Sequence, residues 1–136
     1  MPYVKKSTVV LRVYGKELVP AEITALLGPT PSRQYTAREN KLGKVGMWQL
    51  AASPREPADI DGQIQELLNQ VAGDPAVWRA ITDKYQADLF FCLFMGERNE
   101  GVIISADSMA ALGARGIRVG LDIYGGVDKK DDTNAS

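Results

Sequence analysis

The sequence predicts an α+β domain: a mostly antiparallel sheet in the ferredoxin-like split βαβ pattern, extended by a β-α-β unit, with helices on one face. Three observations lead to this class. Strand-like and helix-like periodicities alternate in the order β-α-β-β-α-β and then β-α-β. Proline, glycine and charged clusters separate these segments. The chain of 136 residues fits one domain, which we expect at 1–126, followed by a disordered tail at 127–136.

The first part of the chain supplies three strands and a helix. Ser7–Tyr14 alternates between two faces, as a half-buried strand does. Pro20 suits a first helical turn and Gly28 suits a helix end, so a short helix is expected between them. Ser32–Ala37 and Val45–Ala52 are rich in strand-forming residues and flank the charged turn RENKLGK, which predicts two strands.

Two helices are predicted in the middle of the chain. Asp59 is placed to cap a helix whose apolar residues recur at helical spacing until Gly73. Asp74 and Pro75 then provide the N-cap and the first turn of a second helix. Both helices are expected to cover the same face of the sheet.

The C-terminal part begins with two apolar segments around the polar turn GERNEG. Ala87–Met95 and Val102–Ser105 are therefore predicted to form a hairpin. Ser105 is also expected to cap a last helix, which Gly113 and Gly116 close.

The last strand, within GIRVGLDIYGG, contains an aspartate among apolar residues. With a period of two, one set of side chains is expected to face the helices and the other set to face away. The first set is Ile117, Val119, Leu121 and Ile123, and the second is Arg118, Gly120, Asp122 and Tyr124. If this strand pairs with the first one, Arg12 and Asp122 become cross-strand partners.

Composition excludes several classes of function. The chain has no histidine and one cysteine, which excludes histidine-based triads, histidine-ligated zinc and an intramolecular disulfide. Its net charge of −1 provides no long-range basic field for nucleic acid. The apolar run Leu89–Met95 is far too short to span a membrane, and no leader peptide is expected. We expect a cytoplasmic protein without cofactor, metal site or membrane association.

Several short stretches occur together in a characteristic order. They are VPAEITALLG followed by prolines, GMWQL at Gly46–Leu50, the leucine-bearing middle helix, GVIIS before a helix, and the terminal GLDIYG. In this order they resemble a bacterial family described as domain of unknown function number 4279. The resemblance covers the chain from Val9 to Tyr124. It implies a fold and a bacterial setting, and it assigns no catalytic residue and no cofactor.

The strand Ala87–Met95 is apolar on both faces, which bears on function. A sheet with helices on one side would leave one of these faces in water, and exposed apolar surface usually marks a partner or ligand site. We therefore expect a non-enzymatic binding protein that uses the exposed sheet face with a protein partner or a second copy. The candidate binding residues are Asp122, Tyr124, Phe90, Phe94, Arg12, Tyr35 and Trp48.

Two alternatives remain open. A small histidine-independent hydrolase or ligand-binding enzyme could use Asp122 with Tyr124 or Tyr35, and it would need these groups, with Trp48, in one concave site. A weak single-stranded nucleic-acid binder could use the basic and aromatic segment from Arg33 to Lys44. The net charge of −1 makes nucleic acid the less favoured partner.

Overall fold

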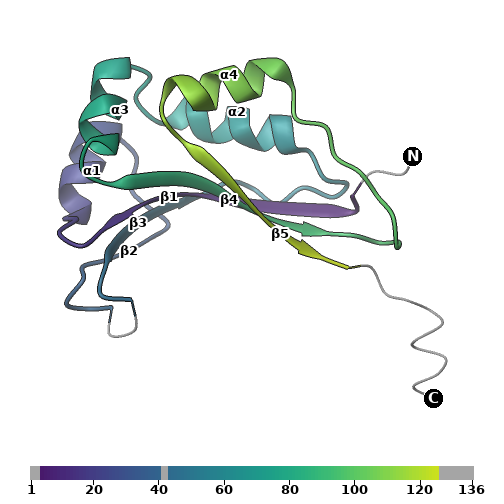
Figure 1. The fold of residues 1–136 in the computed structure, drawn as a ribbon, viewed down its shortest axis with the longest axis horizontal. Coiled ribbons are helices and arrows are strands. Elements are labelled where there is room, and N and C mark those ends of the chain that lie inside the picture. The colour runs from purple at the N-terminus through teal and green to yellow at the C-terminus, as the bar shows by residue number, and fades with distance from the viewer. Residues whose placement is uncertain (1–3, 41–42, 126–136) are drawn as a thin grey trace.

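A computed structural model describes residues 4–40 and 43–125. Four helices lie on one side of a single five-stranded sheet (Figure 1). The predicted tail at 127–136 falls outside the described residues. The elements in chain order are β1 (Lys6–Gly15), α1 (Pro20–Leu27), β2 (Arg33–Tyr35), β3 (Gly46–Ala51), α2 (Ile60–Gln70), α3 (Pro75–Thr82), β4 (Gln86–Phe94), α4 (Ala106–Ala114) and β5 (Arg118–Tyr124).

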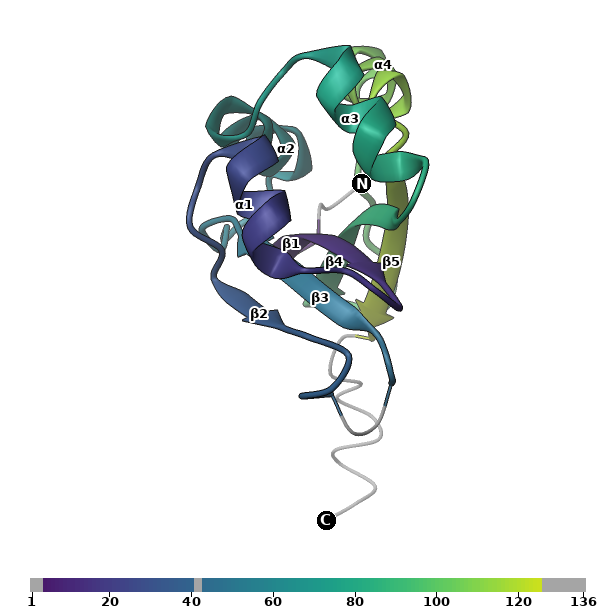
Figure 2. The same cartoon turned by 90° about the vertical axis from the view of Figure 1, so that its left-hand side faces the viewer.

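The sheet confirms the predicted α+β class. Its strand order is β2-β3-β1-β4-β5, and the first four strands are antiparallel neighbours, as in a ferredoxin-like unit. β5 adds to the outer side of β4 as a parallel strand, with α4 as the crossover helix. Figure 2 shows α1 at the β2 side of the sheet and β5 at the opposite edge.

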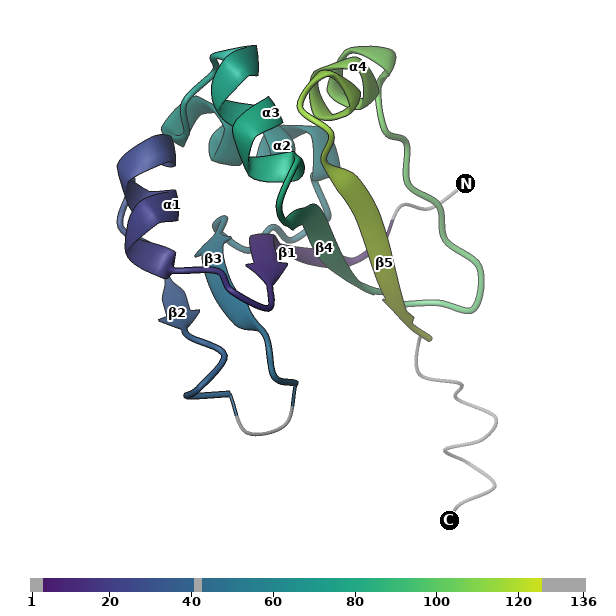
Figure 3. The same ribbon diagram turned by 60° about the vertical axis from the view of Figure 1, so that its left-hand side comes forward.

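The predicted hairpin between Ala87–Met95 and Val102–Ser105 is wrong. The first segment forms β4, whereas residues 102–105 form no strand and lead directly into α4. β4 already has β1 on one side and β5 on the other, so no edge of β4 is left for a returning hairpin strand. The Val102 and Ile104 side chains instead pack against the core. Figure 3 shows the connection from β4 to α4 as an extended chain without a strand.

Alternation along β1 determines what faces the helices. Val9, Leu11 and Val13 are at most 2% exposed, whereas Val10 and Arg12 on the other face are only partly buried.

The helix caps follow the sequence expectations. The side chain of Asp59 caps α2, that of Asp74 caps α3 and that of Ser105 caps α4, while Gly28 closes α1 with φ 111°.

A buried polar network fastens α2 to β1. Gln63 is fully buried, and its Nε2 donates to the carbonyl oxygens of Ser7 and Ser53 at 2.9 and 3.0 Å. Ser7 Oγ donates to Gln63 Oε1 at 2.6 Å and accepts the backbone N–H of Asp59. These bonds satisfy buried polar groups that would otherwise oppose folding, so they fix the position of α2 above the sheet.

A second set of hydrogen bonds, made by Asp61, joins α2 to the start of α4. Asp61 Oδ1 accepts the backbone N–H of Ser105 at 3.0 Å and the hydroxyl of Ser108 at 2.7 Å. The Ser105 backbone bond is the largest contribution that lowers the pKa of Asp61. Because α4 leads directly into β5, this carboxylate helps to position the C-terminal strand.

We expect the hydrogen bonds of Asp61 to make the free energy of unfolding depend on pH. The folded-state pKa of Asp61 is depressed, so its stabilisation is complete above the ordinary aspartate value of about 3.9 and is lost as the pH falls through the lower folded-state pKa. Urea unfolding at a series of pH values should show that Asp61→Asn reduces this loss. Ser108→Ala, which removes one donor, should reduce it less, and an unchanged pH profile in both variants would contradict the prediction.

Candidate functional site

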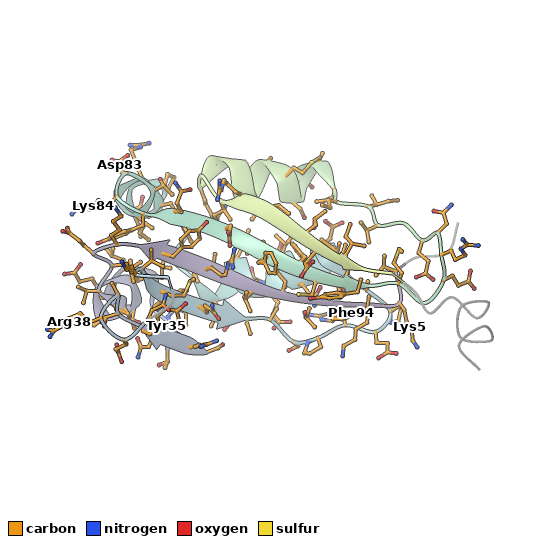
Figure 4. The ribbon with its side chains drawn as sticks, turned by 60° about the horizontal axis from the view of Figure 1, so that its bottom comes forward. Lys5, Tyr35, Arg38, Asp83, Lys84 and Phe94 are labelled. Carbon is orange, nitrogen blue, oxygen red and sulfur yellow. The ribbon has the colours of Figure 1, made fainter. Side chains whose placement is uncertain are left out.

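The candidate functional site is the face of the sheet that carries no helix, hereafter the helix-free face (Figure 4). The strand registers place alternate side chains of every strand on it. They are Lys6, Thr8, Val10, Arg12 and Tyr14 of β1, Arg33 and Tyr35 of β2, Met47, Gln49 and Ala51 of β3, Gln86, Asp88, Phe90, Cys92 and Phe94 of β4, and Arg118, Asp122 and Tyr124 of β5.

A polar row crosses all five strands of this face. Arg33, Gln49, Arg12, Asp88 and Arg118 are successive cross-strand neighbours. At the centre, Arg12 donates from Nε and Nη2 to the two carboxylate oxygens of Asp88, at 2.8 and 2.7 Å. This bidentate geometry is the strongest form of an arginine–carboxylate contact, and these bonds raise the pKa of Arg12.

Asp88 is the buried anchor of the row. It is 4% exposed, because Arg12 and the Tyr14 hydroxyl, which donates at 3.3 Å, cover its carboxylate. Arg118 in turn donates to the Tyr14 hydroxyl at 3.0 Å. The row therefore presents to solvent the two exposed arginines at its ends, Arg33 and Arg118, on either side of a neutralised ion pair.

The expected pairing of Arg12 with Asp122 is wrong. β4 lies between β1 and β5, so Arg12 meets Asp88 instead. Asp122 sits opposite Cys92 and accepts a hydrogen bond from the Tyr124 hydroxyl at 2.8 Å. Asp88 was not among the residues predicted from the sequence, although its position in the alternation of β4 is a usable signal, because it is the one acidic residue of that strand.

The β2 end of the face carries the basic and aromatic residues noted in the sequence. The Arg33 guanidinium lies over the Tyr35 ring, 5.4 Å from its centroid. Arg38 and Lys44 are exposed in the connection between β2 and β3, beyond the paired strands (Figure 4). Lys41 falls outside the described residues.

The opposite end of the face is aromatic. The Phe94 and Tyr124 rings are stacked with centroids 4.9 Å apart and planes inclined by 7°. Lys6 lies over Phe94 at 5.7 Å from the centroid. An open hollow of about 470 Å³ adjoins these residues, and Lys5 and Glu56 contribute to its lining. Figure 4 labels Lys5 and Phe94 at this end of the sheet.

The aromatic rings of this face are largely covered by neighbours from the same chain. Arg12 lies over Phe90 at 4.5 Å from the centroid and over Tyr14 at 5.5 Å. Arg33 similarly covers Tyr35, and Phe94 lies between Lys6 and the Tyr124 ring. The rings are therefore held as parts of a cation–aromatic surface, in which part of each ring already contacts a neighbouring cation or ring.

Trp48 does not join this surface. It faces the helices, is fully buried, and donates from Nε1 to the hydroxyl of Thr24 at 3.0 Å. Tyr35 lies on β2, at the opposite edge of the sheet from Asp122 and Tyr124 on β5. Of the four residues that an enzyme site was expected to combine, Asp122 and Tyr124 are hydrogen-bonded to each other, whereas Tyr35 and Trp48 lie apart from them.

β5 carries apolar exposure that the sequence analysis did not anticipate. Val119, Leu121 and Ile123 are on the helix side, as expected from their register with Leu89 and Phe91 of β4, but they are 40%, 44% and 56% exposed. The helices cover the central strands more completely than this edge strand. Alternation showed which side these residues occupy, and the incomplete cover came only from the tertiary arrangement.

Three further observations concern metal ligation, acid–base chemistry and membrane crossing. Residues 4–40 and 43–125 contain no cluster of three or more metal-ligating side chains. The hydrogen bond to Asp122 raises the pKa of Tyr124, so this phenol is less able to act as a base near neutral pH. Within the same ranges, no helix combines the length and apolar character needed to cross a membrane.

Comparison with known proteins gives one match. The model of the family described as "Domain of unknown function (DUF4279)" matches residues 5–126, which includes every helix and strand described above. Neither the curated proteins nor the solved structures contain a match.

Proposed function

This chain belongs to the DUF4279 family, and we propose that it is a non-enzymatic protein-binding domain whose working surface is the helix-free face. The proposed partner presents an acidic surface to the polar row. The observation that carries this proposal is the concentration of arginine and aromatic side chains on a sheet face that no helix covers.

The residue types on this face match those of protein interfaces. Tyrosine, phenylalanine and arginine are enriched in interface cores and dominate their binding energy, because they combine large contact area with hydrogen-bonding capacity. Tyr14, Phe90 and Phe94 are half-buried in the free chain, so a partner can bury the rest of each ring. The contacts with Arg12 and Lys6 hold these rings in place before binding.

The charge of the face favours an acidic partner. Four cationic side chains, Lys6, Arg12, Arg33 and Arg118, share it with two carboxylates, Asp88 and Asp122. The chain as a whole has a net charge of −1, so the positive charge is local. Such local complementarity steers encounter and excludes wrong partners.

Single-stranded nucleic acid is the second candidate, because Arg33 and Tyr35 form a basic–aromatic pair at the end of the polar row. It is less favoured because stacking of bases requires free ring faces, and arginine or lysine covers most of the rings here. An enzyme is disfavoured because Asp122 and Tyr124 lie at one sheet edge without Tyr35 or Trp48.

The half-buried free thiol of Cys92 fits a reducing compartment, and we propose that the domain acts in the bacterial cytoplasm.

Site-specific photocrosslinking in cells that produce the chain tests this function. A photoreactive residue at Gln49, which lies in the polar row between Arg33 and Arg12, should give a discrete adduct with one other protein, and Arg33→Glu with Arg118→Glu should remove it. Gln65, which is exposed on α2, is the matched control and should give no such adduct. Equal labelling from both positions, or no adduct from Gln49, would contradict the proposal. A nuclease-sensitive adduct would favour the nucleic-acid candidate.

A further inference from the structure

β5 is an edge strand with a full set of outward backbone groups. The Met95 N–H donates to the Tyr124 carbonyl at 3.1 Å, so the backbone groups of Tyr124 and of alternate residues before it point to β4. Those of Val119, Leu121 and Ile123 therefore point away from the sheet. In the described part of the chain no strand lies beyond β5, and Figure 2 shows β5 at the edge of the sheet.

Exposed apolar side chains gather in the same part of the chain. Eight large apolar or aromatic residues of the described ranges are exposed, and six of them belong to the segment 103–124. Val119, Leu121 and Ile123 project their side chains from β5 to the helix side, while Ile103 and Met109 precede this strand. An exposed apolar strand at a sheet edge is a template for pairing with another strand.

The charges of β5 indicate which strand would pair with it. Arg118 and Asp122 lie on one face at equal distances from Gly120, so the segment RVGLD is complementary to itself when reversed. We propose that two copies of this chain associate by antiparallel pairing of β5 with β5, with Gly120 on the two-fold axis. Arg118 of each copy then lies opposite Asp122 of the other, and the two sheets become one. Arg118 and Asp122 also lie on the helix-free face, but this proposal does not depend on the binding function proposed for that face.

Backbone geometry agrees with this register. Val119 of one copy faces Leu121 of the other, and both residues have outward N–H and C=O groups. They therefore form a hydrogen-bonded antiparallel pair, in which each residue donates one backbone hydrogen bond to the other and accepts one from it. The Arg118–Asp122 pairs occupy the non-hydrogen-bonded positions, where side chains approach most closely. The side chains of Val119 and Leu121 meet on the helix side and bury part of their exposed surface.

Other two-fold registers of the same strands are less favourable. Moving the axis to Asp122 places this carboxylate opposite its own copy, and moving it to Arg118 does the same with two guanidinium groups. Axes at Val119 or Leu121 leave Arg118 and Asp122 without each other as direct partners. Charges on an edge strand usually discourage pairing, but here their opposite signs and symmetric positions favour one register.

Charge reversal tests this interface by sedimentation equilibrium over a wide range of protein concentration. In a dimer of Asp122→Arg, an arginine faces an arginine at both symmetry-related pairs of positions 118 and 122. In a dimer of Arg118→Asp, an aspartate faces an aspartate at both pairs. Each single variant should raise the dimer dissociation constant at least about tenfold. The double variant, and an equimolar mixture of the two single variants, should both recover dimers because opposite charges again face each other.

Controls separate this result from general charge effects. Glu22→Arg, an exposed reversal on α1 at the far side of the sheet, should leave dimerisation unchanged. A wild-type chain that is monomeric at the highest concentration reached overturns the proposal. So does a dimer that both single variants leave intact, or single variants that fail to recover dimers when mixed. Loss of the Gln49 crosslink, which tests the helix-free face, does not affect any of these outcomes.

Discussion

Replacing Trp48 with alanine is expected to lower the free energy of unfolding by about 3 to 5 kcal/mol, the largest effect of any single substitution considered for this chain. The ring is fully buried between the sheet and the helices, and its Nε1 is hydrogen-bonded to Thr24 of α1. Truncation removes this contact and leaves a cavity that closely packed neighbours cannot fill. Urea unfolding monitored by circular dichroism measures the change.

The variants Trp48→Phe and Thr24→Val show how much of this loss comes from ring packing and how much from the indole hydrogen bond. Phenylalanine retains much of the buried ring but loses the indole N–H, so a smaller loss is expected. Thr24→Val leaves the indole N–H without its partner and should cost about 1 to 3 kcal/mol. Stability unchanged in Trp48→Ala would mean that the ring is not a core residue and would reopen its role as a ligand contact.

Replacing Asp88 with alanine should have the second largest effect, a loss of about 2 to 3 kcal/mol. Removing one partner of a buried ion pair usually costs about 3 to 5 kcal/mol, but Arg12 retains 26% side-chain exposure and can recover some hydration. The Tyr14 hydroxyl loses an acceptor as well. Asp83→Ala is the matched control, because this aspartate is exposed at the end of α3, and it should change stability by less than about 0.5 kcal/mol.

The double variant Arg12→Met with Asp88→Leu separates stability from binding. Well-packed apolar replacement of a buried ion pair is often neutral or stabilising, so this variant should regain most of the stability lost in Asp88→Ala. It should still weaken the Gln49 crosslink, because the centre of the polar row is gone. A double variant that is stable and crosslinks as well as the wild type would remove the polar row from the proposed interface.

Local patterns predicted most elements of this fold. Alternation identified the two faces of β1 and β5, and capping residues identified the starts of α2, α3 and α4. These features depend on residues close together in the sequence, so periodicity and propensity are sufficient to find them. The hairpin error arose because Val102–Ser105 has the composition of a strand, while its structure depends on which edges of β4 are already occupied.

The candidate site was predicted only in part. The helix-free face contains Phe90, Phe94, Asp122 and Tyr124, as alternation predicts, and Arg12 and Tyr35 lie on it as well. The predicted pairing of Arg12 with Asp122 is replaced by the pairing of Arg12 with Asp88. Asp88, the anchor of the polar row, was missed because the identity of a cross-strand neighbour requires the strand order. Trp48 was assigned to a possible binding role because periodicity alone does not say which face of β3 the helices cover.

By itself, the sequence determined the α+β class, the positions of most helices and strands, the two sets of side chains along each strand, and the absence of histidine chemistry. The tertiary structure decided that β4 separates β1 from β5, that Arg12 pairs with Asp88, and that β5 is an edge with exposed apolar residues. The physical reason is the range of the interactions. Capping and alternation are local, whereas strand order and helix cover depend on contacts between segments far apart in the chain.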